Sequence, residues 1–123
     1  MKLLYPKAVL FDWDNTLVDS WPIIHESWNH TLKTMGQPTW DIATTKERVH
    51  RSLRDVFPEL FGQENWQKAR DIDYEKFLQI HLDNLRMLQD AQSVLQALND
   101  ENIYVGIVSN KTGTYLRKEI ERL

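Results

Sequence analysis

Two short apolar segments that predict β-strands lie far apart in this chain, and only helical patterns lie between them. The first segment is Ala8–Phe11, which ends at Asp12, and the second is 103–109. A continuous apolar run of this length is typical of a parallel strand covered on both faces. Parallel strands need a crossover connection, and this one is so long that it must contain a helical unit of its own. The sequence therefore predicts an α/β fold with a parallel sheet and right-handed crossovers.

Helical spacing of apolar residues predicts a series of helices around these strands. They lie at about residues 20–35, 45–56, 64–88, 91–100 and from 112 onward. Ser20 is expected to cap the first helix, and Gly36 is expected to follow its end. Pro58 and Gly62 are expected to break the second.

The spacing also predicts which helix faces are buried. The inward stripe of the long helix passes through either Ile72 or Asp73. The last helix is expected to turn Leu116, Ile120 and Leu123 inward.

Composition and charge narrow the class of protein. A chain of 123 residues with 41% hydrophobic residues favours one globular domain over a disordered chain. Lys and Arg number 15 against 18 Asp and Glu, and the net charge of −3 gives no electrostatic case for a nucleic-acid partner. No segment has the apolar length of a membrane span, the N-terminal stretch does not match a signal peptide, and there is no cysteine. These observations predict a cytoplasmic protein without a membrane partner.

A pair of carboxylates follows the first predicted strand. Asp12 and Asp14 stand where open parallel sheets bind ligands, outside the carboxyl ends of the strands. Two close carboxylates need a compensating cation, and their hard oxygen atoms favour Mg²⁺. One carboxylate could then attack the phosphorus of a phosphate ester, while the other protonates the leaving alkoxide and later activates water. The alternative is that Asp12, Asp14 and Thr16 are turn and capping residues only.

The second predicted strand ends in a polar group of side chains, Ser109, Asn110 and Lys111. A hydroxyl, an amide and an ammonium group at a strand end suit a bound phosphate, as does the positive end of a helix starting near Thr112. The alternative is that Ser109 and Asn110 form a turn that caps this helix.

Together these segments resemble the haloacid dehalogenase-like hydrolase superfamily, and within it the phosphoglycolate phosphatase-like branch. Residues 12–16 match its first motif, D-x-D-x-T, and Ser109 matches its second motif, a Ser or Thr after an apolar strand. Residues 19–20, 53–58 and 108–111 resemble the branch, so the resemblance covers essentially the whole chain. It implies a parallel Rossmann-like core, of which two strands are present, with an inserted α-helical cap.

The resemblance also implies a role for each matching residue. Asp12 would be the nucleophile and a Mg²⁺ ligand, and Asp14 would be the general acid/base with its backbone carbonyl on the metal. Thr16 would support the loop after the nucleophile. Ser109 would bind the transferred phosphoryl group, with Asn110 beside it. An acid at position 14 favours an oxygen leaving group over a halide, because a halide leaves without a proton.

The implied domains are a core formed by 1–19 and 88–123 and a cap formed by 20–87. The cap would close over the site, select the substrate and exclude water during the first transfer. A basic stripe in the cap, consisting of Lys46, Arg48, Arg51 and Arg54, is either a solvated face or a source of contacts to a substrate anion.

Two further motifs of the superfamily have no match before the chain ends: a Lys or Arg beside the nucleophile and an acidic pair on the metal. Lys111 is expected to face the phosphate or to cap the last helix, and replacing the missing cation is the alternative left open. Glu119 and Glu121 lie on a helix that leads away from the site, so neither is expected on the metal. The chain is therefore interpreted as the N-terminal portion of a longer protein. Alone, it would need a dimer or a complementing C-terminal fragment to cover its sheet edges.

The predicted function is hydrolysis of a small phosphorylated metabolite by a Mg²⁺-dependent phosphatase through an aspartyl-phosphate. A phosphomutase, which uses the same pair of aspartates, stays open. So does a catalytically incompetent fragment or pseudoenzyme that acts as an interaction module. A receiver domain of a response regulator has a similar length, but the helix-only stretch 20–101 disfavours it. The five tryptophans are expected to pack in the core or at an interface, and the four histidines lack metal-ligand spacing.

Overall fold

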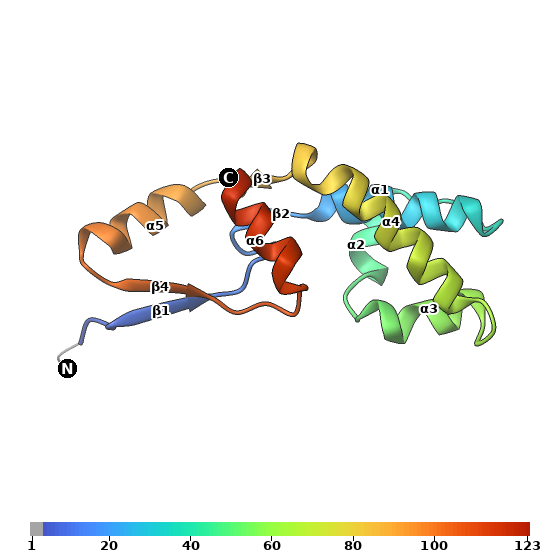
Figure 1. The fold of residues 1–123 in the computed structure, drawn as a ribbon, viewed down its shortest axis with the longest axis horizontal. Coiled ribbons are helices and arrows are strands. Elements are labelled where there is room, and N and C mark those ends of the chain that lie inside the picture. Colours follow the sequence, from blue (N-terminus) through green and yellow to red (C-terminus); the bar gives the residue numbers. More distant parts are fainter. Residues whose placement is uncertain (1–3) are drawn as a thin grey trace. The chain divides into compact units, whose positions relative to one another are not determined.

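The computed structural model describes residues 4–123, which form two compact units (Figure 1). The first unit contains 4–20 together with 85–123, and the second, called the helical unit below, is Trp21–Asn84. The helical unit is thus inserted into the chain between the two parts of the first unit.

The first unit contains a parallel pair of strands, as the apolar segments predict. Strand β1 (Ala8–Phe11) pairs with β4 (Tyr104–Ile107), and Ala8 lies opposite Tyr104 and Phe11 opposite Ile107. Helix α5 (Ala91–Asp100) precedes β4, and helix α6 (Gly113–Arg122) follows it. A second, antiparallel pair joins β2 (Val18–Asp19) to β3 (Arg86–Met87). These strands have two residues each, too few for an alternating pattern to be recognised in the sequence.

The expectation that β1 is covered on both faces is wrong for this unit. The side chain of Leu10 is 68% exposed, and Tyr104 on β4 is 81% exposed. Full coverage of a parallel strand needs neighbouring strands and helices on both faces, whereas the sheet here consists of β1 and β4. Leu10 lies over Gly106, where an added Cβ would come within 2.7 Å of its Cδ2 atom.

The helical unit is built from helices α1 (Trp21–Thr34), α2 (Ile42–Arg48), α3 (Leu53–Phe61) and α4 (Trp66–Asn84). Its core is aromatic: the ring centroid of Phe57 lies 4.7 Å from that of Trp28 and 5.1 Å from that of Phe61, both edge to face. Burial of such side chains contributes roughly 1.5–3 kcal/mol each, so this core supplies the unit with much of its stability.

Residues 45–56, predicted as a single helix, lie in two helices. Helix α2 ends at Arg48, since the ψ of 57° at Val49 is not helical. Helix α3 begins after Ser52, which has an extended backbone. Asp41 caps α2, because its Oδ1 atom accepts a hydrogen bond of 2.7 Å from the backbone N–H of Thr44. Pro58 lies inside α3 instead of ending it, where it removes a single helical hydrogen bond.

The ends predicted from glycine are confirmed. Gly36 follows α1 with a φ of +79°, and Gly62 follows α3 with a φ of +82°. A left-handed backbone of this kind is strained for residues that carry a Cβ atom.

Burial on two helices differs from the expected apolar stripes. In α4 the buried position is Asp73, which is 6% exposed, and not Ile72. In α6 Glu119 is completely buried, whereas Ile120 is 40% exposed, and Leu123, directly after the helix, is 47% exposed. The expectation that these two apolar residues face inward is therefore wrong, because a charged contact described below draws Glu119 inward. Within residues 4–123, no helix combines the length and the apolar character that crossing a membrane requires.

Candidate active site

The candidate site begins in the loop that leaves β1. The carbonyl oxygen of Trp13 accepts hydrogen bonds from the backbone N–H groups of Thr16, Leu17 and Val18 at 3.0–3.3 Å, which makes the loop tight. Asn15 adopts a φ of +59°, a left-handed conformation that asparagine tolerates better than most residues. Its Oδ1 atom accepts a 2.9 Å hydrogen bond from the N–H of Ser20, which ties the two ends of the loop together.

The two aspartates of this loop have different surroundings. Asp12 is exposed at the end of β1, and its Oδ1 atom accepts a hydrogen bond of 2.8 Å from the N–H of Trp13. The Oδ1 atom of Asp14 accepts two hydrogen bonds, one of 2.5 Å from the Ser20 hydroxyl and one of 2.7 Å from Lys111 Nζ. Its Oδ2 atom makes no hydrogen bond within residues 4–123. One oxygen of Asp14 is thus anchored, and the other remains available for chemistry.

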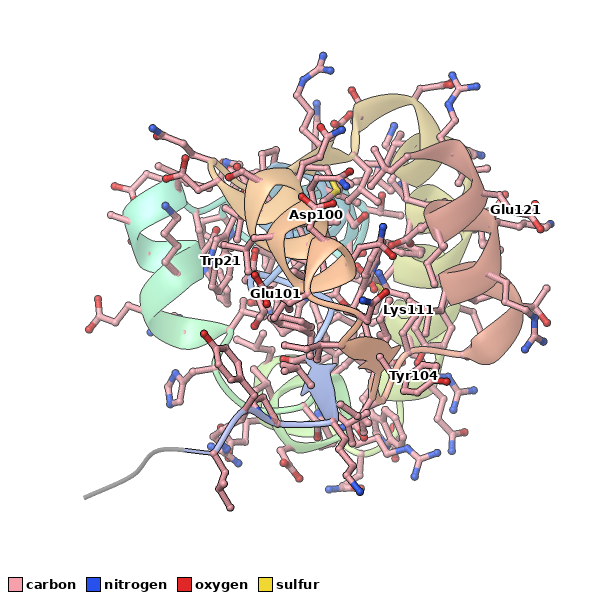
Figure 2. The ribbon with its side chains drawn as sticks, turned by 90° about the vertical axis from the view of Figure 1, so that its left-hand side faces the viewer. Trp21, Asp100, Glu101, Tyr104, Lys111 and Glu121 are labelled. Atoms are coloured by element: carbon pink, nitrogen blue, oxygen red, sulfur yellow. The ribbon has the colours of Figure 1, made fainter. Side chains whose placement is uncertain are left out.

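Lys111 joins two carboxylates. Its Nζ atom lies 2.7 Å from Asp14 Oδ1, 2.7 Å from Glu119 Oε1 and 3.0 Å from Glu119 Oε2. The indole N–H of Trp13 also donates to Glu119 Oε1, at 2.9 Å. Figure 2 shows Glu121 on the outer side of α6, pointing away from Lys111. Of the two glutamates on α6, Glu119 alone belongs to this network.

The hydrogen bonds of the Asp14 side chain within residues 4–123 do not involve Ser109, Asn110 or Thr16. The Ser109 hydroxyl accepts a hydrogen bond of 3.1 Å from the N–H of Lys111, a local turn of the kind left open as the alternative to phosphate binding. Asn110 and Thr16 are exposed. Because β1 and β4 are parallel and paired to their ends, Asp12 and Ser109 leave the same edge of the sheet.

The oxygen atoms of the two aspartates at this edge of the sheet suit a Mg²⁺ ion that is also bound by water and substrate. Mg²⁺ is usually held by one or two carboxylates, with water and substrate phosphate completing its shell. The exposed carboxylate of Asp12 provides such oxygen atoms, and the backbone carbonyl of Asp14 would provide another, so that the Asp14 carboxylate stays available for proton transfer. No group of three or more His, Cys, Asp or Glu side chains in the described part of the chain forms a complete metal site. The residues therefore fit a metal shared with a substrate and not one enclosed by protein ligands.

Glu119, Trp13 and Ser20 are members of the network that were not among the predicted site residues. Glu119 carries a signal in hindsight, because it follows Leu116 by three residues and so shares its helix face. Ser20 was expected to cap α1, and its hydroxyl donates to Asp14. The contact from Trp13 joins residues 106 positions apart, and no local pattern announces it.

Two of the four residues of the basic stripe contact side chains within the helical unit. The guanidinium group of Arg48 lies 5.1 Å from the ring centroid of Trp40, and Arg51 forms a 3.1 Å ion pair with Glu59. These residues line an open pocket of about 370 Å³ that also borders His50. The Arg51–Glu59 pair is exposed on both sides, so it adds little stability and can exchange for another anion.

Comparison with known proteins identifies related sequences over most of the chain. The sequence model of a family described as haloacid dehalogenase-like hydrolase matches residues 9–123. A provisionally named pyrophosphatase, PpaX of Clostridium perfringens (strain 13 / Type A), is 30% identical over 108 residues, 85% of this chain and 49% of that protein. A phosphoglycolate phosphatase of Xanthomonas campestris pv. campestris (strain 8004) is 30% identical over 111 residues, 87% of this chain and 50% of that protein. The chain spans about half the length of these curated relatives.

A solved structure supports the same relationship at the level of the fold. A haloacid dehalogenase-like family hydrolase from Streptococcus pneumoniae superimposes with a TM-score of 0.87 at 22% sequence identity. The match covers 96% of this chain and 56% of that chain. The predicted α/β fold class with parallel strands is therefore confirmed.

Proposed function

The chain belongs to the haloacid dehalogenase-like hydrolase family, and on that premise we propose that it carries catalytic residues of a Mg²⁺-dependent phosphatase. The substrate would be a small phosphorylated metabolite. One observation carries the proposal: the parallel pairing of β1 and β4 directs two aspartates and the hydroxyl of Ser109 to one sheet edge, and Asp14 offers an unbonded Oδ2 atom there.

The proposed reaction has two transfers at phosphorus. In the first, a carboxylate oxygen of Asp12 bonds to phosphorus, the ester P–O bond breaks, and Asp14 donates its proton to the leaving oxygen. In the second, Asp14 takes a proton from water, the water oxygen attacks phosphorus, and the bond to Asp12 breaks to release inorganic phosphate. The hydroxyl of Ser109 would donate a hydrogen bond to the phosphoryl oxygens during both transfers. A bound Mg²⁺ ion would offset the negative charge of the carboxylates and the phosphate.

The helical unit would serve as the cap. It follows directly in the chain after the loop that bears Asp12 and Asp14. A ligand bound at that loop could therefore be coupled to closure of the cap. Arg48 and Arg51 would then be candidates for contact with the part of the substrate that does not react. The cap limits of 20–87 predicted from the sequence remain a proposal.

The proposal is tested with the purified 123-residue chain, Mg²⁺ and p-nitrophenyl phosphate. We expect turnover that EDTA removes, Mg²⁺ restores and Asp12→Asn lowers at least a thousandfold, because the nucleophile is lost. Asp100→Asn is the matched control, since Asp100 is exposed on α5 and bonds to Gln96 on the same helix. Pyrophosphate and 2-phosphoglycolate, suggested by the names of the two relatives, are compared as substrates.

Two results would overturn the proposal for this chain. Turnover that survives Asp12→Asn would place the chemistry elsewhere or in a contaminant. A chain that is folded by circular dichroism but hydrolyses none of the three substrates would favour the interaction module instead.

A further inference from the structure

We propose that Lys111 is a positioning residue that orients the carboxylate of Asp14, and that Glu119 and Trp13 hold Lys111 in place. This inference rests on the proposed function, in which Asp14 is the general acid/base. In this role Lys111 orients Asp14 instead of binding phosphate, and the buried Glu119 serves as the ion-pair partner of Lys111.

The first observation is the closeness and burial of the contacts. The side chain of Lys111 is 11% exposed, and its ammonium group lies 2.7 Å from oxygen atoms of both Asp14 and Glu119. Hydrogen bonds between charged groups are about twice as strong as neutral ones. A flexible lysine side chain held at both carboxylates has lost most of its rotational freedom, so it presents a fixed charge to Asp14.

The second observation is the burial of Glu119. Its side chain is completely buried, a state that strongly disfavours a carboxylate unless it is paired and hydrogen-bonded. Lys111 supplies the opposite charge, and the indole N–H of Trp13 supplies a further donor at 2.9 Å. Trp13 is itself 3% exposed, so the Glu119 carboxylate is fixed from two directions. Glu119 thereby holds Lys111 through a second ion pair, in addition to the one with Asp14.

The third observation is the asymmetry of Asp14. Lys111 and Ser20 both donate to its Oδ1 atom, and its Oδ2 atom is left without a hydrogen bond in the described part of the chain. Anchoring one oxygen fixes the rotation of the carboxylate, and a fixed carboxylate can deliver a proton along one direction. Loss of Lys111 should therefore lower the rate of proton transfer to the leaving group more than it weakens the binding of phosphate.

The test uses two substrates that differ in their need for an acid. The leaving group of p-nitrophenyl phosphate departs as a stable phenolate, whereas that of β-glycerophosphate is an alkoxide that needs a proton. The double variant Lys111→Met/Glu119→Gln removes both charges together, so that no unpaired charge stays buried. We expect its kcat on β-glycerophosphate to fall at least tenfold more than its kcat on p-nitrophenyl phosphate, with KM for both within about twofold of wild type.

The opposite results assign other roles to Lys111. A large increase in KM for both substrates with kcat preserved would make Lys111 a phosphate-binding residue, as the sequence predicted. An equal loss of kcat on both substrates would also overturn the inference. Circular dichroism of the double variant checks its folding, and Lys111→Arg, which can keep both ion pairs, should recover part of the selective loss.

A second measurement does not depend on activity. Acetic anhydride acetylates accessible lysines, and Lys118, which is exposed on α6, serves as the internal reference. We expect Lys111 to react at least tenfold more slowly than Lys118 in the wild type, and this protection to fall in Glu119→Gln. Equal reactivity in the wild type would overturn the inference whatever the activity. If Lys111 is protected but the chain hydrolyses neither substrate, the proposed function is rejected, and the positioning of Asp14 for proton transfer is rejected with it. The contact between Lys111 and Glu119 would still be supported.

Discussion

Replacing Asp73 with asparagine should stabilise the helical unit at neutral pH. Asp73 lies on α4 and is 6% exposed, and its Oδ1 atom makes no hydrogen bond within residues 4–123. Burial in these surroundings raises the pKa of Asp73 from 3.8 to about 7. An asparagine has nearly the same shape and carries no charge, so it removes the cost of burying a carboxylate.

The size of the effect follows from the two pKa values. A tenfold change in a dissociation constant is worth about 1.4 kcal/mol, so the interval from 3.8 to about 7 corresponds to an upper limit of about 4 kcal/mol. The folded chain binds this proton more tightly than the unfolded chain. The contribution of Asp73 to stability is therefore fully present below about pH 4, falls as the pH rises towards 7, and is constant above that.

The assay is urea unfolding followed by circular dichroism at pH 4.5 and pH 8. We expect Asp73→Asn to be more stable than wild type at pH 8, by up to about 4 kcal/mol, and to gain much less at pH 4.5. Asp71→Asn is the matched control, because Asp71 lies two residues earlier on α4 with its side chain 72% exposed. Its effect should stay within about 0.5 kcal/mol at both pH values.

One outcome would refute the reasoning. If Asp73→Asn destabilises the chain equally at both pH values, then the carboxylate is ionised and satisfied in the folded state. Burial without a partner would then be the wrong description of this position.

Three further predictions concern contacts in both units. Trp13→Phe keeps an aromatic ring but removes the N–H donor to buried Glu119, and we expect a loss of about 1–3 kcal/mol in thermal unfolding; a loss below about 0.5 kcal/mol would count against the hydrogen bond. Asp41→Ala removes the cap of α2 and should destabilise the chain at pH 7. Hydrogen bonds from Thr44 lower the pKa of Asp41, so the destabilisation caused by this substitution should vanish as the pH falls through that lowered pKa. If Arg51 contacts the substrate, Arg51→Ala should raise KM without lowering kcat in a steady-state assay, and an unchanged KM would mean that the stripe is a solvated face.

The parts of the structure that follow local rules could be predicted from the sequence. Helix α5 was predicted at about 91–100 and lies at Ala91–Asp100, because apolar residues recur along it at helical spacing. Gly36 and Gly62 mark helix ends, since the left-handed backbone there favours glycine. The break between α2 and α3 was missed, because Ser52 was not recognised as the start of a new helix within an apparently continuous pattern.

The sequence by itself determined the family, the α/β class and the polar residues that follow β1 and β4, because motifs and apolar runs consist of neighbouring positions. The tertiary structure alone decided the partners of the charged side chains. Lys111 reaches Asp14 across 97 positions, and the buried face of α6 belongs to Glu119 and not to Ile120. A helical pattern predicts burial from apolar character alone. It therefore cannot predict that a carboxylate with an ion-pair partner is buried in place of an isoleucine.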